Sequence, residues 1–338
     1  MLTQKKFIFI LSWYSAISIG VLIAAPFFGS ENLSWNNVSG SILSGQTNVD
    51  SDIFFSLRLP RVITSFIVGG ILSVAGSALQ VVLRNPLAEP FILGIAGSGA
   101  VGAVIAISIP GLLIHLGAFS SVQFLSLTGS MLCVLIIYWL AVNKPDFSMT
   151  NILLSGVTIN IFCGAMILLV RYMADPGHLV AMDRWMMGGL DVVGYGEVFT
   201  LLPLVLPGLI LLFLKCNTLN QLAFGEEMAT GHGVNVASVQ RHVFLGSGLA
   251  TAGAVSIAGP IGFVGLIIPH AVRRISGVDN RVVLPSSFLL GGAFLTVCDL
   301  VARTIVAPTE MPVGIITAIV GGPLFLRILL KGESMRGE

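Results

Sequence analysis

Long apolar stretches separated by shorter polar ones run along the whole chain. A helix of roughly 17 to 25 residues crosses a bilayer core about 30 Å thick, and most of the apolar stretches have this length. The pattern therefore predicts an all-α, polytopic membrane protein with about ten transmembrane helices. The predicted spans are 7–28, 61–83, 91–109, 116–142, 151–171, 198–215, 242–258, 260–272, 282–302 and 312–330.

The eighth predicted span, 260–272, is too short for a straight helix across the bilayer. It could merge with the seventh, 242–258, which would leave about nine helices. Proline removes a backbone donor, so a broken apolar segment survives in a membrane only where packed neighbours satisfy its backbone. Such interrupted spans are typical of transporters. The interruptions here are Gly259, Pro260, Gly262, Gly265 and Pro269.

Three segments are long and polar enough to lie in water: 29–60, 172–197 and 216–240. With a cytoplasmic N-terminus and the spans above, the first two lie outside and the third inside. No low-complexity linker separates the apolar stretches, so residues 1–338 are predicted to form a single transmembrane domain.

Composition agrees with this class. Hydrophobic residues make up 55% of the chain and charged residues 10%, with a mean hydropathy of +0.96, whereas a soluble domain is about 25% charged. The apolar run after Lys5 and Lys6 extends to Phe28, which is longer than the core of a signal peptide. We therefore predict that it is the first membrane helix of a chain whose partners include membrane lipid.

The basic residues set the predicted orientation, because cytoplasmic loops carry an excess of Lys and Arg. Both termini are predicted to be cytoplasmic, since most basic residues then fall inside. A formal net charge of +1 and the lack of a basic patch interleaved with aromatics argue against a nucleic-acid partner. The residues left outside are Arg58, Arg61, Arg171, Arg184 and Arg303.

Two helices rich in small residues indicate an inverted repeat. Arg61 opens one that contains residues 74–78, and Arg241 opens another that contains residues 251–255. The two would enter the membrane from opposite sides, which is a common transporter plan. Shared composition is the alternative explanation. In either case the glycines allow close helix packing.

Catalytic motifs are missing from the sequence. It contains no phosphate-binding G-x-x-x-x-G-K-[ST], no G-x-S-x-G and no H-E-x-x-H, so we predict no catalytic, metal-binding or cofactor-binding residues on this chain. Asp299 lies within a span, and Arg303 one helical turn later can pair with it. A stand-alone carrier driven by an ion gradient is thus the alternative from a different class.

Several strings resemble the FecCD-type permeases, the membrane subunits of ABC importers for iron-siderophores, haem and cobalamin. The resemblance covers residues 57 to 330, in matching order and spacing. Its most specific parts are the strings NPLAEP at 85–90 and GFVGLIIPH at 262–270. The other matching strings are LRLPR at 57–61, RWMMGG at 184–189, GEE at 225–227, DNR at 279–281 and EMPVG at 310–314.

The resemblance implies a bundle like that of the cobalamin permeases, which works as a homodimer in a bacterial inner membrane. Two cytoplasmic ABC ATPase subunits would hold ATP and magnesium, and a periplasmic or lipid-anchored binding protein would deliver the substrate. A ferric siderophore is the expected cargo. Cobalamin or haem is the alternative, because residues 185–189 are similar to those of cobalamin permeases.

The resemblance also implies that the loop 216–240 contacts the ATPase through a short helix. Glutamates favour a helix N-terminus and glycines its end, which fits the order of residues in this loop. His232 departs from the family, which usually has an apolar residue there. The matching positions are Gly225, Glu226, Glu227, Ala229, Gly233, Val234 and Val236, and Gly231 is predicted to end the helix together with Gly233.

Three arginines match family positions that receive acidic residues of the binding protein: Arg58, Arg61 and Arg303. We expect each to reach water at an outer helix end, and anchoring in the membrane interface by snorkelling is the alternative. Arg171 and Arg184 have no assigned role, and they could pair with Asp175 or Asp183.

Overall fold

A computed structural model of the chain describes residues 3–31, 33–44, 48–112, 115–116, 119–143 and 149–334. Helices account for nearly all of its regular structure. A short antiparallel pair, β1 (His115–Leu116) and β2 (Phe119–Ser120), is the strand structure within these ranges. The helices are α1 (Gln4–Ala24), α2 (Trp35–Ser44), α3 (Val49–Asp52), α4 (Leu59–Val82), α5 (Ile95–Ser108), α6 (Ser121–Asn143), α7 (Met149–Met173), α8 (Pro176–Met186), α9 (Gly196–Leu214), α10 (Cys216–Ala223), α11 (Glu226–Gly231), α12 (Val236–Ala258), α13 (Val264–Ser276), α14 (Asn280–Thr304) and α15 (Val313–Ser334).

Each predicted span coincides with one of the helices, which confirms the all-α membrane fold. Within the described residues, 6 helical segments are long and apolar enough to cross a membrane by length and composition. Two further apolar helices, at Ile95–Ser108 and Val313–Arg327, are shorter. The number of crossings, about ten, therefore stays a prediction.

The break between α12 and α13 makes them two separate helices. Gly259 ends α12 with φ +67°, and Phe263 precedes α13 with φ +70°. A side chain at Gly259 would place its Cβ 2.7 Å from the Trp185 carbonyl oxygen, so glycine is needed both for the turn and for the close approach.

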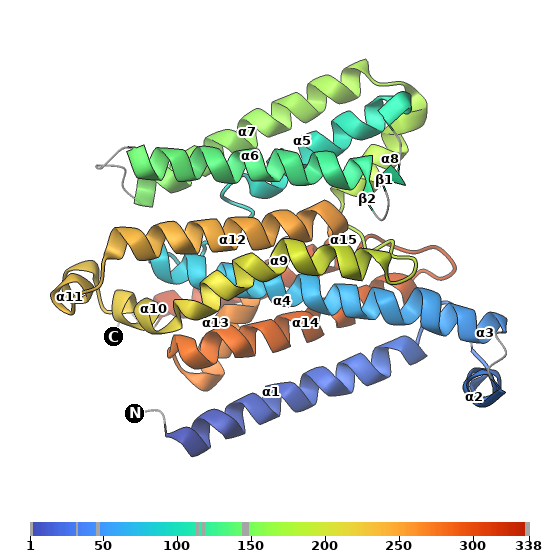
Figure 1. Ribbon diagram of the computed structural model, residues 1–338, viewed down its shortest axis with the longest axis horizontal. Helices are drawn as coiled ribbons and strands as arrows, with labels where there is room; N and C mark the ends of the chain where they lie inside the picture. Colours follow the sequence, from blue (N-terminus) through green and yellow to red (C-terminus); the bar gives the residue numbers. More distant parts are fainter. Residues whose placement is uncertain are drawn as a thin grey trace.

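The helices pack as an elongated bundle (Figure 1). Helices α5 to α8 lie along one side, and α1 lies along the opposite edge. The most extensive packing joins α4 to α14, α5 to α6 and α12 to α9. Small residues line these contacts: a Cβ on Gly69 would come within 2.6 Å of Leu295, and one on Gly70 within 2.7 Å of Phe288. This is the close packing that the glycine-rich helices predict.

The two ends of the bundle differ. Figure 1 shows both marked termini at the end that carries α10 and α11, and it shows α2, α3 and α8 at the other end. The predicted polar segments 29–60 and 172–197 thus share one end, here called the outer end. Segment 216–240 lies at the inner end. Helices α4 and α12 run in opposite directions, as an inverted repeat requires.

The described part of segment 29–60 contains the helices α2 and α3. A helical run begins at Val49 and continues to Val82 through a π-helical turn at Ile53–Arg58. Asn48 starts the run with a capping box, because its side chain accepts from the Ser51 N–H while Ser51 Oγ accepts from the Asn48 N–H, both at 2.9 Å. The span predicted to begin at residue 61 therefore extends further toward the outer end.

Candidate functional site

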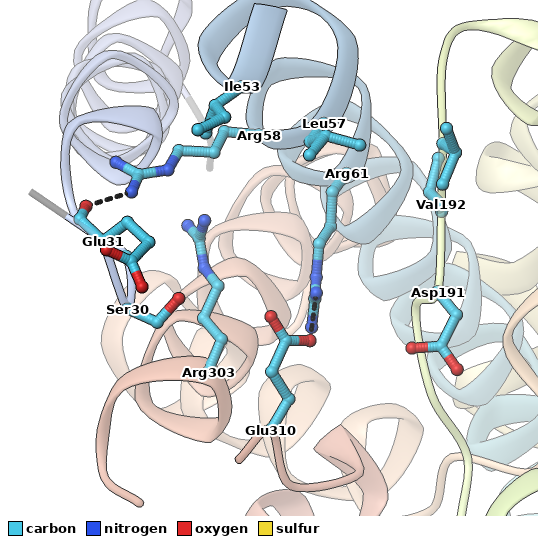
Figure 2. Close-up of a pocket in the computed structure, with 12 residues that line it drawn as sticks. Ser30, Glu31, Ile53, Leu57, Arg58, Arg61, Asp191, Val192, Arg303 and Glu310 are labelled. Carbon is cyan, nitrogen blue, oxygen red and sulfur yellow. Dashed lines mark hydrogen bonds and ion pairs between the residues drawn. The ribbon is translucent and has the colours of Figure 1, made fainter. Parts of the chain in front are cut away.

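A cavity of about 340 Å³ opens at the outer end of the bundle. It lies among the segment after α1, the first turns of α4, the end of α14 and the loop before α9 (Figure 2). Its polar lining contains all three arginines expected to dock a binding protein. The lining residues are Gly29, Ser30, Glu31, Ile53, Leu57, Arg58, Arg61, Asp191, Val192, Val193, Arg303 and Glu310.

Arg61 lies at the centre of the charged cluster. Its Nε donates to Asp299 Oδ1 at 3.0 Å and its Nη2 lies 2.9 Å from the same atom. Its Nη1 donates to Glu310 Oε2 at 2.6 Å, a contact visible in Figure 2. One guanidinium therefore joins a fully buried carboxylate on α14 to a carboxylate at the surface.

Arg58 and Arg303 are buried, which corrects the expectation that they reach water. Their exposed fractions are 6% and 3%. Arg58 donates to the carbonyl oxygens of Pro26, Phe27 and Glu31, and Arg303 Nη2 donates to Ala25 O at 2.8 Å. Residues 25–31 thus cover both guanidiniums with backbone acceptors.

Asp299 joins the cluster from α14. The predicted pairing with Arg303 is confirmed at 3.6 Å between Arg303 Nε and Asp299 Oδ2. The closer partner is Arg61, which the sequence analysis missed because it lies 238 residues away in the chain. A buried carboxylate held between two guanidiniums is an ion-pair partner.

Arg171 and Arg184 lie in other ion pairs. Arg171 pairs with Asp183, one of the two partners considered for it. Arg184 pairs with Asp191 at 3.2 Å, so the expectation of Asp175 or Asp183 as its partner is wrong. Both members of the Arg184 pair are mostly exposed, and such pairs contribute little to stability.

Helices α10 and α11 form a projecting knob at the inner end (Figure 1). Glu226 and Glu227 lie in the first turn of α11, where the helix dipole favours negative charge. Phe224 and Met228 project to solvent with exposed fractions of 75% and 56%. Exposed apolar side chains beside carboxylates form a surface that can bury itself against a partner.

The short helix begins at Glu226 and ends at Gly231, as predicted from the glutamates and glycines of this loop. Gly225 precedes it with φ +127°, and α11 ends at Gly231. The left-handed turn that reverses the chain lies at Gly233, with φ +81°. Ala229 is buried beneath the turn and its carbonyl accepts the Val234 N–H at 3.0 Å, so these two residues hold the knob together.

His232 is exposed, and its Nδ1 lies 2.7 Å from the Met228 carbonyl oxygen. His232 is therefore part of the exposed surface of the knob.

Asn220 fixes α10 to the start of α14. Its Nδ2 donates to Asp279 Oδ1 at 2.7 Å, and its Oδ1 accepts the Asn280 N–H at 2.6 Å. Hydrogen bonds from Arg281 are the main cause that lowers the pKa of Asp279 to about 2. The stability linked to this depressed pKa is fully present above the ordinary pKa of an Asp carboxyl, and it is lost as the pH falls from there toward 2.

A second cavity, of about 560 Å³, lies beside the break between α12 and α13. Glu89 and Phe263 both line it. Met186 and Met187 also line it, together with the first turns of α15. The cavity is mostly apolar, and its other lining residues are Phe91, Pro260, Gly262, Gly314, Ile315, Ala318 and Ile319.

The chain matches the model of the FecCD transport family over residues 16–331. It is 35% identical over 318 residues to the hemin transport system permease HmuU of Yersinia pestis, which covers 94% of this chain and 95% of the relative. It is 40% identical over 278 residues to the cobalamin import permease BtuC of Halobacterium salinarum, covering 82% of this chain and 73% of the relative.

The iron(3+)-hydroxamate import permease FhuG of Bacillus subtilis is 33% identical over 321 residues and covers 93% of this chain and 95% of the relative. A solved structure described as an inward-facing conformation of a metal-chelate type ABC transporter superposes with a TM-score of 0.83 at 27% identity. It covers 95% of this chain and 99% of that one. The chain therefore belongs to the FecCD transport family, whose members are membrane-spanning permeases of metal-chelate ABC importers.

Proposed function

We propose that this chain is the permease subunit of an importer that takes up a ferric siderophore, driven by ATP hydrolysis on separate subunits. The observation that carries the proposal is the α10–α11 knob. It presents Phe224, Met228 and two glutamates to solvent at the end of the bundle opposite the arginine-lined cavity. One end is thus suited to an energy-supplying partner and the other to a delivery partner.

In this proposal the single domain 1–338 pairs with a second copy, and two ABC ATPases bind at the inner end. ATP and magnesium are held by the ATPases, and this chain binds no cofactor. The inner end is cytoplasmic and contains both termini, which agrees with the bias of basic residues. The membrane is the bacterial inner membrane.

The knob is proposed to transmit conformational changes of the ATPase to the membrane helices of the permease. Glu226, Glu227 and the apolar pair Phe224 and Met228 would enter a groove on the ATPase. Gly225, Gly231 and Gly233 set the ends of the helix, while Ala229 and Val234 stabilise its buried side. The bonds from Asn220 to Asp279 and Asn280 then connect the knob to α14. Because α14 carries Asp299 and Arg303 near its other end, it links the inner knob to the outer cavity.

The outer cavity is proposed to receive the binding protein through Arg58, Arg61 and Arg303. Arg61 is the most accessible of the three, with 13% of its side chain exposed. Arg58 and Arg303 lie behind it and add positive potential. Charge complementarity of this kind mainly sets the encounter rate and the register of two partners.

The cavity beside the α12–α13 break is proposed to be part of the substrate path, with its lining residues facing the substrate. Its methionines are flexible and polarisable, so they can adapt to a bulky chelate. Relatives named for hemin, cobalamin and hydroxamate are 35%, 40% and 33% identical to this chain. These identities do not rank the three cargoes, and cobalamin or haem is the second candidate.

Reconstitution tests both the function and the cargo. The chain would be placed in proteoliposomes with its ATPase and binding protein and offered a ferric hydroxamate, cobalamin and hemin in turn. We expect ATP-dependent uptake of the ferric hydroxamate, with the other two taken up at least about tenfold more slowly. Faster uptake of cobalamin or hemin would overturn the assigned cargo, and no uptake of any chelate would overturn the function.

A further inference from the structure

Arg61 binds two carboxylates whose surroundings differ sharply. Asp299 is fully buried and also pairs with Arg303, so its departure would leave Arg303 without its ion-pair partner. Glu310 contacts Arg61 through Nη1 alone, and 35% of its side chain is exposed. The inner carboxylate is therefore fixed, whereas the outer one can be exchanged.

The segment that carries Glu310 allows such an exchange. Residues 305–310 are all exposed, and they form turns between α14 and α15. The segment is fastened again after Glu310, where the Met311 N–H donates to Ala302 O at 3.1 Å. Moving the Glu310 side chain would therefore disturb little packing.

We propose that Glu310 occupies, in the free permease, the place on Arg61 that a carboxylate of the binding protein takes on docking. This inference rests on the proposed docking role of the cavity and specifies how it works. Without Glu310 the Nη1 group of this partly buried guanidinium would lose its acceptor, which is unfavourable even though Asp299 stays paired with Nε and Nη2. Glu310 satisfies Arg61 until the partner arrives, and it competes with the incoming carboxylate.

The structure supplies a matched control for this competition. Asp191 lines the same outer cavity as Glu310, and the two also line a smaller pocket that contains Arg61. Asp191 pairs with Arg184 instead of Arg61. Removing either carboxylate raises the local net charge by one unit. Only the loss of Glu310 leaves the Arg61 Nη1 group free to bind another carboxylate.

The test measures binding of the purified binding protein to the reconstituted transporter at low salt. Glu310→Gln should lower Kd about threefold to tenfold, and Asp191→Asn should lower it less than about twofold, since removing a direct competitor adds to the general change in potential. Glu310→Asp, which keeps the carboxylate, should stay near wild type. Arg61→Ala should raise Kd.

Two outcomes separate the exchange from the docking role. Suppose that Arg61→Ala weakens binding while Glu310→Gln and Asp191→Asn change Kd equally. The proposed exchange of Glu310 is then wrong, but the proposal that the binding protein docks at the cavity is supported. If Arg61→Ala leaves Kd unchanged, the binding protein docks elsewhere and both ideas fail. Size-exclusion profiles of each variant in detergent verify that the compared proteins are folded.

Discussion

Replacing both Glu226 and Glu227 with arginine should reduce ATP-dependent transport by roughly tenfold or more. Two positive side chains would lie at the positive end of the α11 dipole, and the surface offered to the ATPase would reverse its charge. Close charge pairs across interfaces couple by about 1.5 to 7 kcal/mol, and about 1.4 kcal/mol already corresponds to a factor of ten. Uptake and ATPase activity would be measured on the same proteoliposomes.

The variant Glu226→Gln with Glu227→Gln is the graded control. It removes the charges but keeps the side-chain shape, including an acceptor oxygen for the bond from Gln240 to residue 226. Its transport should lie between those of the wild type and the double arginine variant. Wild-type uptake with normal ATPase stimulation in the arginine variant would show that the knob does not contact the ATPase as proposed.

Replacing Asp299 with alanine should destabilise the permease strongly. The side chain is fully buried between Arg61 and Arg303, at 2.9 Å and 3.6 Å. Breaking a buried ion pair by removing one partner costs about 3 to 5 kcal/mol, because the remaining charge is left uncompensated. We expect a lower yield of monodisperse protein in detergent and a lower unfolding temperature.

Asp183→Ala is the matched control for this prediction. Asp183 also pairs with an arginine, Arg171, but 42% of its side chain is exposed. An exposed pair contributes only about 0 to 1 kcal/mol, so this variant should remain close to wild type. Equal unfolding temperatures for the two variants would contradict the view that the outer cluster stabilises the fold.

The helices could be predicted because a membrane span must be long and apolar, and both properties can be read from one continuous segment of sequence. The ends of α11 could be predicted for a similar reason, because each depends on residues next to it in the sequence. Glu226 lies in the first turn of the helix, and Gly233 forms the left-handed turn that follows its last residue. The continuation of α4 back to Val49 was missed. This part of the helix contains polar residues such as Asp50 and Asp52, so it lacks the apolar pattern of a membrane span. It begins at a capping box instead.

The burial of Arg58 and Arg303 could not be predicted from local pattern. It depends on residues 25–31 folding over both side chains and supplying carbonyl acceptors. The contact of Arg61 with Asp299 and that of Asn220 with Asp279 join residues 238 and 59 positions apart. Helical periodicity says nothing about such pairs. Phe224 and Met228 did carry a signal, because they are large apolar residues four positions apart in a loop predicted to lie in water.

Comparing ATP with an ion gradient tests the central claim most directly. Proteoliposomes that contain the permease, its ATPase and its binding protein would be loaded with ATP or given a proton or sodium gradient, and uptake of a ferric hydroxamate would be followed. The account predicts uptake with ATP that persists when the gradients are collapsed, and none with a gradient alone. Uptake by the permease alone, driven by a gradient without ATP, would contradict it.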